Sequence, residues 1–318
     1  MNEFDLIAQY FTRPTPSADL GIGDDAALVS VSAGHQLAVS ADMLVAGRHF
    51  FADVDPEALG HKSLAVNLSD MAAMGATPTW FTLSLALPEV NEAWLAGFSR
   101  GLFALADQYS VPLIGGDTTR GPLTIAIQIA GEVPKGQALR RDGAHVGDDV
   151  WVSGRLGGAA AAVMHKTGRA ILSSEALRLC EQRLDRPSPR IALGVALRGI
   201  ATAALDLSDG LLGDLAHICE RSNCSARIDF NKVPHAIELN KLNHDLSAEA
   251  ALAGGDDYEL CFTAGAAERQ AIESLSVSLN LPLTRVGQIT ERDKRLLTVL
   301  DAAGQAMPLS YSGFDHFK

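Results

Sequence analysis

The chain has 318 residues, 47% of them hydrophobic and 20% charged, so it is long enough to bury the cores of two domains. Its formal net charge of −12 argues against a nucleic-acid surface, which would need clustered Lys and Arg, but permits an anionic substrate bridged by divalent cations. The first residues are acidic, and no apolar run approaches the roughly 20 residues of a membrane helix, so the sequence predicts a cytoplasmic protein with no membrane partner.

The first half of the chain is predicted to form one domain over residues 1–135. Its expected elements are a short helix at 4–12, a glycine-rich loop at 21–27, strands at 27–31, 37–40, 80–87, 111–114 and 123–133, and helices at 56–74 and 92–109. The stretch 134–149 is rich in Gly and charge and has little periodicity, so the domain junction is placed there.

The second domain, 136–318, is predicted to mix strands and helices in the same way. Its expected strands are 150–154, 203–207, 226–230, 258–263 and two more near the end, and its expected helices are 157–167, 173–184, 190–200, 267–279 and one after 210. Mixed strands and helices in both halves favour a two-domain α/β or α+β architecture. All four cysteines lie in this half, without metal-like spacing, which favours a reducing compartment.

The helix expected at 56–74 carries a thin polar stripe. Asp55 can cap its start, and Gly75 can end it. Ser63, Asn67 and Asp70 fall at i, i+4 and i+7 among Ala, Leu, Val and Met. A carboxylate in such surroundings needs a partner, for which a cation is the natural choice and capping of a neighbouring element is the alternative.

Aspartates recur where predicted strands and helices end, often beside glycines. They are Asp24, Asp25, Asp42, Asp70, Asp117, Asp206, Asp209, Asp256 and Asp257. If the fold brings these ends to a common face, the carboxylates would repel one another unless cations lay between them. Mg²⁺ suits such a site, because it takes a few carboxylates and shares its other positions with water and substrate phosphates. The alternative is that each Asp serves as a turn or cap residue.

Other phosphate and hydrolase chemistries lack their motifs in this chain. There is no G-x-x-x-x-G-K-[ST], G-x-S-x-G or H-E-x-x-H, and the nine histidines show no zinc-like spacing. The G-x-G-x-x-A pattern at 21–26 follows no convincing strand and would turn two aspartates toward a pyrophosphate. An enzyme acting on phosphates would therefore work without a P-loop.

Seven motifs stand in one order along nearly the whole chain: GIGDDAA at 21–27, ADMLVAGRHF at 41–50, NLSDMAAMGATP at 67–78, GGDTT at 115–119, DLSDG at 206–210, GGDDYEL at 254–260 and GFDHF at 313–317. Together they resemble the thiamine-monophosphate kinase family of the aminoimidazole ribonucleotide synthetase-like superfamily. The resemblance implies a two-domain fold whose N-terminal domains pair in a homodimer. It also implies ATP-dependent phosphorylation of thiamine monophosphate to thiamine diphosphate with several Mg²⁺ ions. The alternatives are another ATP-dependent enzyme of the superfamily and a non-enzymatic cation-binding protein.

The resemblance also implies roles for individual residues. The implied Mg²⁺ ligands are Asp25, Ser40, Asp42, Asp70, Asp117, Asp206 and Asp209. The implied nucleotide contacts are Gly116, Asp117, Arg141 and Ser208, with Arg140 competing for the place of Arg141. The implied thiamine phosphate contacts are His49, Phe314 and either Asp256 or Asp257. Two departures stand out: Ala41 replaces a frequent Thr, so a side-chain ligand is lost, and Ser99 replaces a frequent Tyr.

No catalytic acid or base is predicted beyond the metal and phosphate ligands. A phosphate monoester has a second pKa of about 6, so the acceptor is mostly dianionic at neutral pH and needs no general base. The reaction needs in-line placement and suppression of the repulsion between two anions, which Mg²⁺ ions held by carboxylates supply.

Overall fold

The computed structural model describes residues 3–16 and 18–308, so the predicted contact at Phe314 lies outside the described residues. The chain divides into two compact units, 1–71 with 76–136, and 72–75 with 137–318. No helix of the described ranges is long and apolar enough to cross a membrane.

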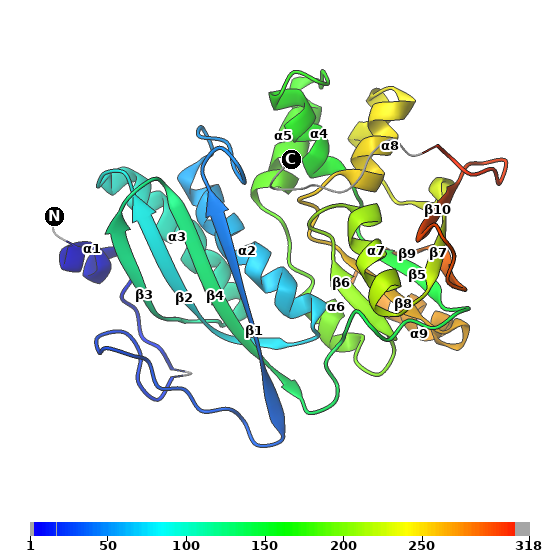
Figure 1. Cartoon of the computed structure of the whole chain (residues 1–318). Helices are drawn as coiled ribbons and strands as arrows, with labels where there is room; N and C mark the ends of the chain where they lie inside the picture. The colour runs from blue at the N-terminus through cyan, green and yellow to red at the C-terminus, as the bar shows by residue number, and fades with distance from the viewer. Residues whose placement is uncertain (1–2, 17, 309–318) are drawn as a thin grey trace. The chain divides into compact units, whose positions relative to one another are not determined.

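The first unit is one four-stranded sheet with helices packed on it. Its elements are α1 (Glu3–Tyr10), β1 (His35–Val45), α2 (Pro56–Ala73), β2 (Thr77–Leu87), α3 (Glu92–Tyr109), β3 (Leu113–Arg120) and β4 (Thr124–Pro134). The strand order is β1-β4-β2-β3, with β3 parallel to β2 and the other pairs antiparallel. Helices α2 and α3 cover one side of the sheet (Figure 1). The other side is called the open face below.

Helix α2 begins and ends where its capping signals predict. The backbone N–H of Ala58 donates to Asp55 Oδ2 at 3.0 Å, which satisfies one of the free donors of the first turn. At the other end Gly75 has a φ of 62°, and the N–H of Ala76 donates to the carbonyl of Met71 at 2.8 Å. This is the left-handed glycine termination typical of helix ends.

Two glycines let α2 and α3 approach at backbone distance. A Cβ on Gly60 would lie 2.0 Å from the carbonyl oxygen of Phe98, and one on Gly101 would lie 1.8 Å from that of Glu57. Any larger residue at either position would push the helices apart. The close contact fixes α2, and with it the polar stripe, against the sheet.

One predicted strand of this unit is absent, and other strands extend beyond their predicted ends. The segment 27–31 is no strand: Leu28 makes only an isolated bridge to Leu20 and is 57% exposed. Strand β1 continues to Val45 and β3 continues to Arg120, because both pair along their full length with neighbours. Asp42 and Asp117 therefore lie inside strands rather than at strand ends.

The second unit is a six-stranded mixed sheet with the order β10-β7-β9-β5-β8-β6. Its strands are β5 (Asp149–Ser153), β6 (Ala203–Asp206), β7 (Ser225–Asp229), β8 (Leu260–Ala264), β9 (Leu283–Thr290) and β10 (Leu297–Leu300). Its helices are α4 (Gly158–Lys166), α5 (Ser174–Asp185), α6 (Ile191–Ala196), α7 (Leu211–Arg221), α8 (His244–Ala253) and α9 (Arg269–Ser278), with short 3₁₀ turns at Phe230–Lys232, Ile237–Lys241 and Ala266–Glu268.

Two helices of this unit differ from the sequence prediction. The helix expected at 190–200 is only six residues long, as α6. Helix α8 was not predicted, because its Ala-rich sequence has no clear apolar stripe. It is nevertheless capped by Asn243, whose side chain accepts the N–H of Leu246 at 2.9 Å. The four cysteines are free thiols and all are buried.

Asp149 is expected to stabilise the second unit by about 2 kcal/mol at neutral pH. Its buried carboxylate accepts hydrogen bonds from Nε of Arg269, at 2.6 Å, and from Nη1 of Arg285, at 3.4 Å. Burial raises the pKa of this carboxyl, but the two arginines outweigh burial and hold the pKa below its ordinary value. The Asp149→Asn variant should therefore show a lower urea midpoint at pH 7.

The sign of the pH dependence follows from the lowered pKa. The contribution of Asp149 is present above the ordinary Asp pKa of about 3.9 and is lost as the pH falls through the folded-state value. The midpoints of wild type and Asp149→Asn should therefore converge below about pH 4. Glu220→Gln, at an exposed carboxylate beside His217, is the control and should change the midpoint little. A difference between wild type and Asp149→Asn that is constant from pH 7 to pH 3 would contradict this account.

Candidate active site

A first group of polar residues lies between β1 and α2, on the helix-covered side of the sheet. Ser40 Oγ donates to Asp70 Oδ2 at 2.5 Å, and the backbone N–H of Asp42 donates to Asn67 Oδ1 at 3.3 Å. The amide of Asn67 is oriented in turn by its own bond to the carbonyl of Ser63, at 3.0 Å. The polar stripe of α2 therefore faces the central residues of β1. We call Ser40, Asp42, Asn67 and Asp70 the helix-side group.

The helix-side group contains two carboxylates, Asp42 and Asp70, and the ionised form of each disfavours ionisation of the other. Burial, and secondly the negative charge of Asp70, raise the pKa of Asp42 to about 7. Such a pair is costly when both groups are ionised and becomes favourable when a cation neutralises them. The donor atoms are all oxygen, which suits Mg²⁺.

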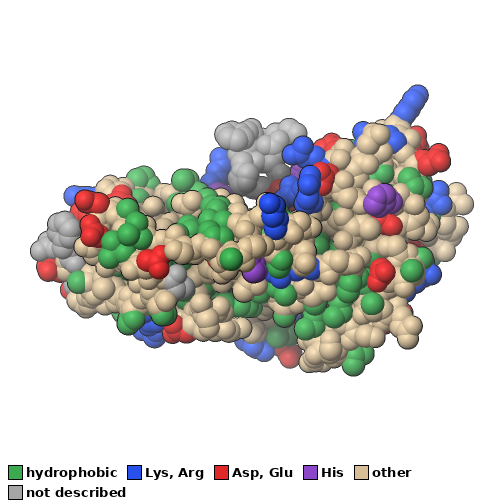
Figure 2. Space-filling view, turned by 90° about the horizontal axis from the view of Figure 1, so that it is seen from below, with side chains coloured by type: hydrophobic (Ala, Val, Ile, Leu, Met, Phe, Trp, Pro, Cys, Tyr) green, Lys and Arg blue, Asp and Glu red, His purple; other side chains and the backbone are tan. Residues whose placement is uncertain are grey.

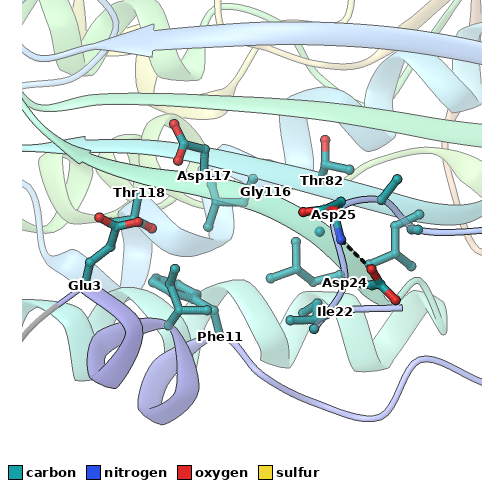
Figure 3. Close-up of a pocket in the computed structure, with 17 residues that line it drawn as sticks. Glu3, Phe11, Ile22, Asp24, Asp25, Thr82, Gly116, Asp117 and Thr118 are labelled. Atoms are coloured by element: carbon teal, nitrogen blue, oxygen red, sulfur yellow. Dashed lines mark hydrogen bonds between the residues drawn. The ribbon is translucent and has the colours of Figure 1, made fainter. Parts of the chain in front are cut away.

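A second group surrounds a cavity of about 720 Å³ beside the edge strand β3. Figure 3 shows Asp24 and Asp25 on a loop that passes near Thr82 and Gly116, with Phe11, the residue after α1, across the cavity. Apolar side chains of α1, of the loop and of β3 line part of the wall, and Asp24, Asp25 and Asp117 also line it. We call this cavity the edge pocket.

The edge pocket combines apolar walls with backbone that a ligand can approach. Gly116 has a φ of 156°, and a Cβ there would lie 1.9 Å from the carbonyl oxygen of Leu83. Only glycine fits this position, so the strand stays paired while its backbone lines the cavity. An apolar wall with a few polar groups and a volume of several hundred Å³ is typical of a small-molecule site.

Strand register places Asp42 and Asp117 on opposite sides of the same sheet. Asp42 pairs with Ile127, which is buried on the helix side. Asp117 pairs with Ser84, and Ser84 pairs with Ala126. Along their strands Ser84 and Ala126 alternate with buried side chains that face the helices, so all three paired residues belong to the open face. The expectation of one common face is therefore wrong for these two carboxylates within a single chain.

In the second unit, two loops that are distant in sequence lie side by side. The N–H of Asp256 donates to the carbonyl of Ser208 at 2.9 Å, and the N–H of Tyr258 donates to the carbonyl of Leu207 at 2.8 Å. Asp206 ends β6 just before this contact, and Asp209 follows it. The motifs DLSDG and GGDDYEL thus form one local structure, as a shared site would require.

The adjacent residues Asp256 and Asp257 differ in their hydrogen bonds. Both oxygens of the Asp257 carboxylate accept the backbone N–H of Gly157, at 3.0 and 2.9 Å, just before α4. Burial raises the pKa of Asp257 well above its ordinary value. Asp256 has a φ of 66°, and both residues are partly exposed. The bond to Gly157 gives Asp257 a structural contact, and which of the two meets the substrate stays a prediction.

Arg141 and Arg140 also differ in their surroundings. Arg140 Nη2 forms an exposed ion pair with Asp142 at 2.5 Å. The positive charge of Arg141 instead acts on Asp214, a buried carboxyl in the first turn of α7 whose pKa burial raises to about 7. Arg141 therefore lies near the DLSDG loop, while its preference over Arg140 as a nucleotide contact stays a prediction. Asp214 was not among the predicted site residues, and its position five residues after Asp209 was the available signal.

The remaining predicted positions lie in the first unit. His49 Nδ1 accepts the backbone N–H of Val45 at 3.0 Å in the loop after β1, which orients its ring. Ala41 pairs with Gln128, so its side chain belongs to the open face rather than to the helix-side group. The hydroxyl of Ser99 donates to the carbonyl of Ala96 within α3, at 3.4 Å.

Among residues 3–16 and 18–308, no three His, Cys, Asp or Glu side chains stand close enough to hold a metal unaided. Mg²⁺ is commonly held by one or two carboxylates together with water and substrate phosphates. The Asp42 and Asp70 pair, with its raised pKa, fits that mode of binding. A Mg²⁺ ion here would be completed by a phosphate-bearing ligand.

Comparison with known proteins identifies the relatives of the chain. Residues 23–133 match the N-terminal domain, and residues 145–299 the C-terminal domain, of AIR synthase related proteins. The thiamine-monophosphate kinase of Escherichia coli (strain K12) is 47% identical over 321 residues, which cover 99% of this chain and 98% of the relative.

Two solved structures extend the similarity to the fold. The thiamine-monophosphate kinase from Stenotrophomonas maltophilia K279a has a TM-score of 0.84 and 50% identity, covering 92% of this chain and 93% of its own. AaThiL complexed with AMPPCP and TMP has a TM-score of 0.79 and 30% identity, covering 91% of this chain and 89% of its own.

Proposed function

Because the chain belongs to the thiamine-monophosphate kinase family, we propose that it transfers the γ-phosphoryl group of ATP to the phosphate of thiamine monophosphate, giving thiamine diphosphate and ADP. The observation that carries this conclusion is the full-length identity of 47% to a kinase of that name, together with all the acidic motifs in order. The buried free cysteines further support a cytoplasmic enzyme.

In the first unit, we propose that the helix-side group and the edge pocket bind Mg²⁺ and ATP. The Mg²⁺ ligands are Asp25, Ser40, Asp42, Asp70 and Asp117. The apolar wall of the edge pocket suits the adenine ring, and the backbone of Gly116 can approach the nucleotide closely. Mg²⁺, when bound, neutralises phosphate charge and so lets two anions approach.

In the second unit, the paired loops supply further ligands. Asp206 and Asp209 would hold Mg²⁺, while Ser208 and Arg141 would contact the nucleotide. The guanidinium of Arg141 suits a phosphate, since it presents several donors in a fixed plane. For thiamine monophosphate we propose His49 and Asp256, with Phe314 as a stacking partner for an aromatic ring.

The chemistry requires little from the protein beyond placement. The acceptor phosphate is already mostly dianionic near neutral pH, so no side chain needs to remove a proton. What the reaction does require is in-line placement of the two phosphate groups. A cation bound between Asp42 and Asp70 would relieve their mutual repulsion, which favours binding of ATP together with its cation.

We also propose a homodimer that pairs through the open face of the first sheet. Leu37, Val39 and Met43 of β1 are 37%, 50% and 58% exposed on this face. Figure 2 looks at the first unit, at left, from below and so shows this face only from its edge, with hydrophobic and acidic side chains interspersed. Contiguous exposed apolar side chains are typical of a surface that a partner covers. A second copy would also bring its own Asp117, which lies on this face.

The direct test is an assay with purified protein, ATP, MgCl₂ and thiamine monophosphate, with products separated by chromatography. Stoichiometric formation of ADP and thiamine diphosphate is expected, with no turnover after chelation by EDTA. Absence of thiamine diphosphate, with ATP consumed on another acceptor, would transfer the chain to a different activity of the superfamily.

The variants Asp256→Asn and Asp257→Asn are expected to fail in different ways. Asp256→Asn should raise the KM for thiamine monophosphate at least about tenfold with little loss of stability, since a ligand-facing charge is removed. Asp257→Asn should lower the melting temperature, because its carboxylate holds Gly157. Initial rates and thermal melts of both variants measure this, and a KM effect confined to Asp257→Asn would reverse the assignment.

A further inference from the structure

Asp214 lies one turn into α7, and its carboxylate reaches back to the DLSDG loop. It accepts the backbone N–H of Asp209 at 3.0 Å, and the N–H of Ser208 is a second backbone donor to it. Asp214 is only 5% exposed. The two N–H groups belong to adjacent residues, one of which is a proposed metal ligand and the other a proposed nucleotide contact.

Helix capping alone does not explain this carboxylate. The N-cap residue of α7 is Gly210, which has no side-chain capping bond, and the donors to Asp214 precede the helix rather than belong to its first turn. Burying a carboxylate here is costly. Its contacts instead stabilise the conformation of residues 208–209.

The Ser208 peptide is held from its other side as well. Its carbonyl accepts the N–H of Asp256, at 2.9 Å, and a Cβ on Gly255 would lie 2.5 Å from that oxygen. Asp214 and the 254–258 loop thus hold one peptide segment from two directions. Charges of opposite sign, on Arg141 and Asp209, also act on Asp214.

We propose that Asp214 is a positioning residue for nucleotide binding, which fixes the backbone of Ser208 and Asp209 so that their side chains face Mg²⁺ and ATP. This inference rests on the proposed function only in assigning the nucleotide to that loop. It assigns Asp214 no contact with substrate.

The test compares two buried aspartates of the same unit. Asp148 is 6% exposed and likewise accepts a backbone N–H, from His145 at 2.8 Å, and the hydroxyl of Thr202 at 2.7 Å. Asp148 lies outside the proposed site, so Asp148→Ala and Asp148→Asn are matched controls for Asp214→Ala and Asp214→Asn. Binding of the ATP analogue AMPPCP with Mg²⁺ is measured by calorimetry on the full-length protein, alongside melting temperature and kinetics.

Asp214→Ala should weaken AMPPCP binding about tenfold or more and raise the KM for ATP, while the KM for thiamine monophosphate stays within about twofold. Asp214→Asn should recover part of the affinity, since its amide oxygen still accepts one N–H, and it serves if the Ala variant does not fold. The Asp148 variants should lower the melting temperature without weakening AMPPCP binding. The proposal is overturned if the Asp214 variants bind AMPPCP normally, or if the Asp148 variants lose as much affinity.

The calorimetric readout separates this inference from the proposed function. A wild type that binds AMPPCP but does not phosphorylate thiamine monophosphate would overturn the choice of acceptor and leave the role of Asp214 still measurable. A wild type that makes thiamine diphosphate, with Asp214 variants of unchanged affinity, would overturn only the positioning role.

Discussion

Asp42→Asn and Asp70→Asn are each expected to lower kcat about 10³-fold without loss of folding stability. The two carboxylates meet beside α2, where burial and mutual repulsion raise the pKa of Asp42 to about 7. An amide of the same size removes the repulsion, so the free energy of unfolding without Mg²⁺ should stay the same or rise. Loss of activity together with retained stability is typical of a binding site and not of a structural pair.

Kinetics and thermal melts with and without Mg²⁺ and ATP check this expectation. Wild type should gain several degrees in melting temperature from the ligands, and the two variants should gain much less. Ser40→Ala removes a neutral hydroxyl, which donates to Asp70 and is a proposed Mg²⁺ ligand, but no carboxylate charge, so its loss of kcat should be smaller, about tenfold. Asp107→Asn, at an exposed ion pair with Arg13, is the unaffected control. Near-normal turnover in both Asp42→Asn and Asp70→Asn would remove the helix-side group from the site.

Capping residues and turn glycines predicted the ends of helices, because they act on neighbours only a few residues away. Helix α2 begins at a capping Asp55 and ends at a left-handed Gly75, and both signals are visible in the sequence. The segment 27–31 shows what local patterns cannot predict. Its apolar residues are typical of a strand, but a strand also needs a neighbouring strand to pair with, and Leu28 forms only an isolated bridge.

The activity was predictable from the sequence, whereas the arrangement of the candidate site was not. The order of the motifs resembles an ATP-dependent kinase family, and full-length relatives support that activity. The binding of Mg²⁺ by the carboxylates stays a prediction. Which carboxylates meet depends on strand register and burial, which no local pattern encodes. Asp256 and Asp257 are adjacent in sequence and both partly exposed, yet the carboxylate of Asp257 accepts the N–H of Gly157, a contact 100 residues away that no local pattern indicates.

The buried Asp214 illustrates a second limit. An Asp in the first turn of a helix is ordinarily a favourable neighbour of the helix dipole, so apart from its position five residues after Asp209 the sequence gives no reason to single it out. Its importance appears only when the structure shows its carboxylate turned back to the N–H of Asp209. Residues that position a site are harder to recognise from sequence than residues that contact a ligand, because their partners are backbone atoms.

Asp117→Asn is expected to lower kcat by about 10²- to 10³-fold. A mixed dimer of one Asp117→Asn chain and one Asp42→Asn chain should recover activity. Asp117 belongs to the open face, whereas Asp42 and Asp70 lie on the helix side of the same sheet. Mg²⁺ ligands lie about 2.1 Å from the ion, so carboxylates separated by a sheet do not share one. Because β1 and β3 are the two edge strands of the sheet, a homodimer that sets β3 of one protomer beside β1 of its partner can bring Asp117 round the sheet edge to a site that contains the partner's Asp42.

Co-expression of an Asp42→Asn chain and an Asp117→Asn chain with different tags gives a mixed dimer that distinguishes the arrangements. When each site takes Asp117 from one protomer and Asp42 from the other, one site carries both changes and the second is fully intact. The purified mixed dimer should then reach about half of wild-type activity, although each parent homodimer is nearly inactive. When both residues act within one chain, every site of the mixed dimer is damaged and activity stays at the level of the parents. Recovery therefore requires a shared site, because no arrangement within one chain restores an intact set of ligands.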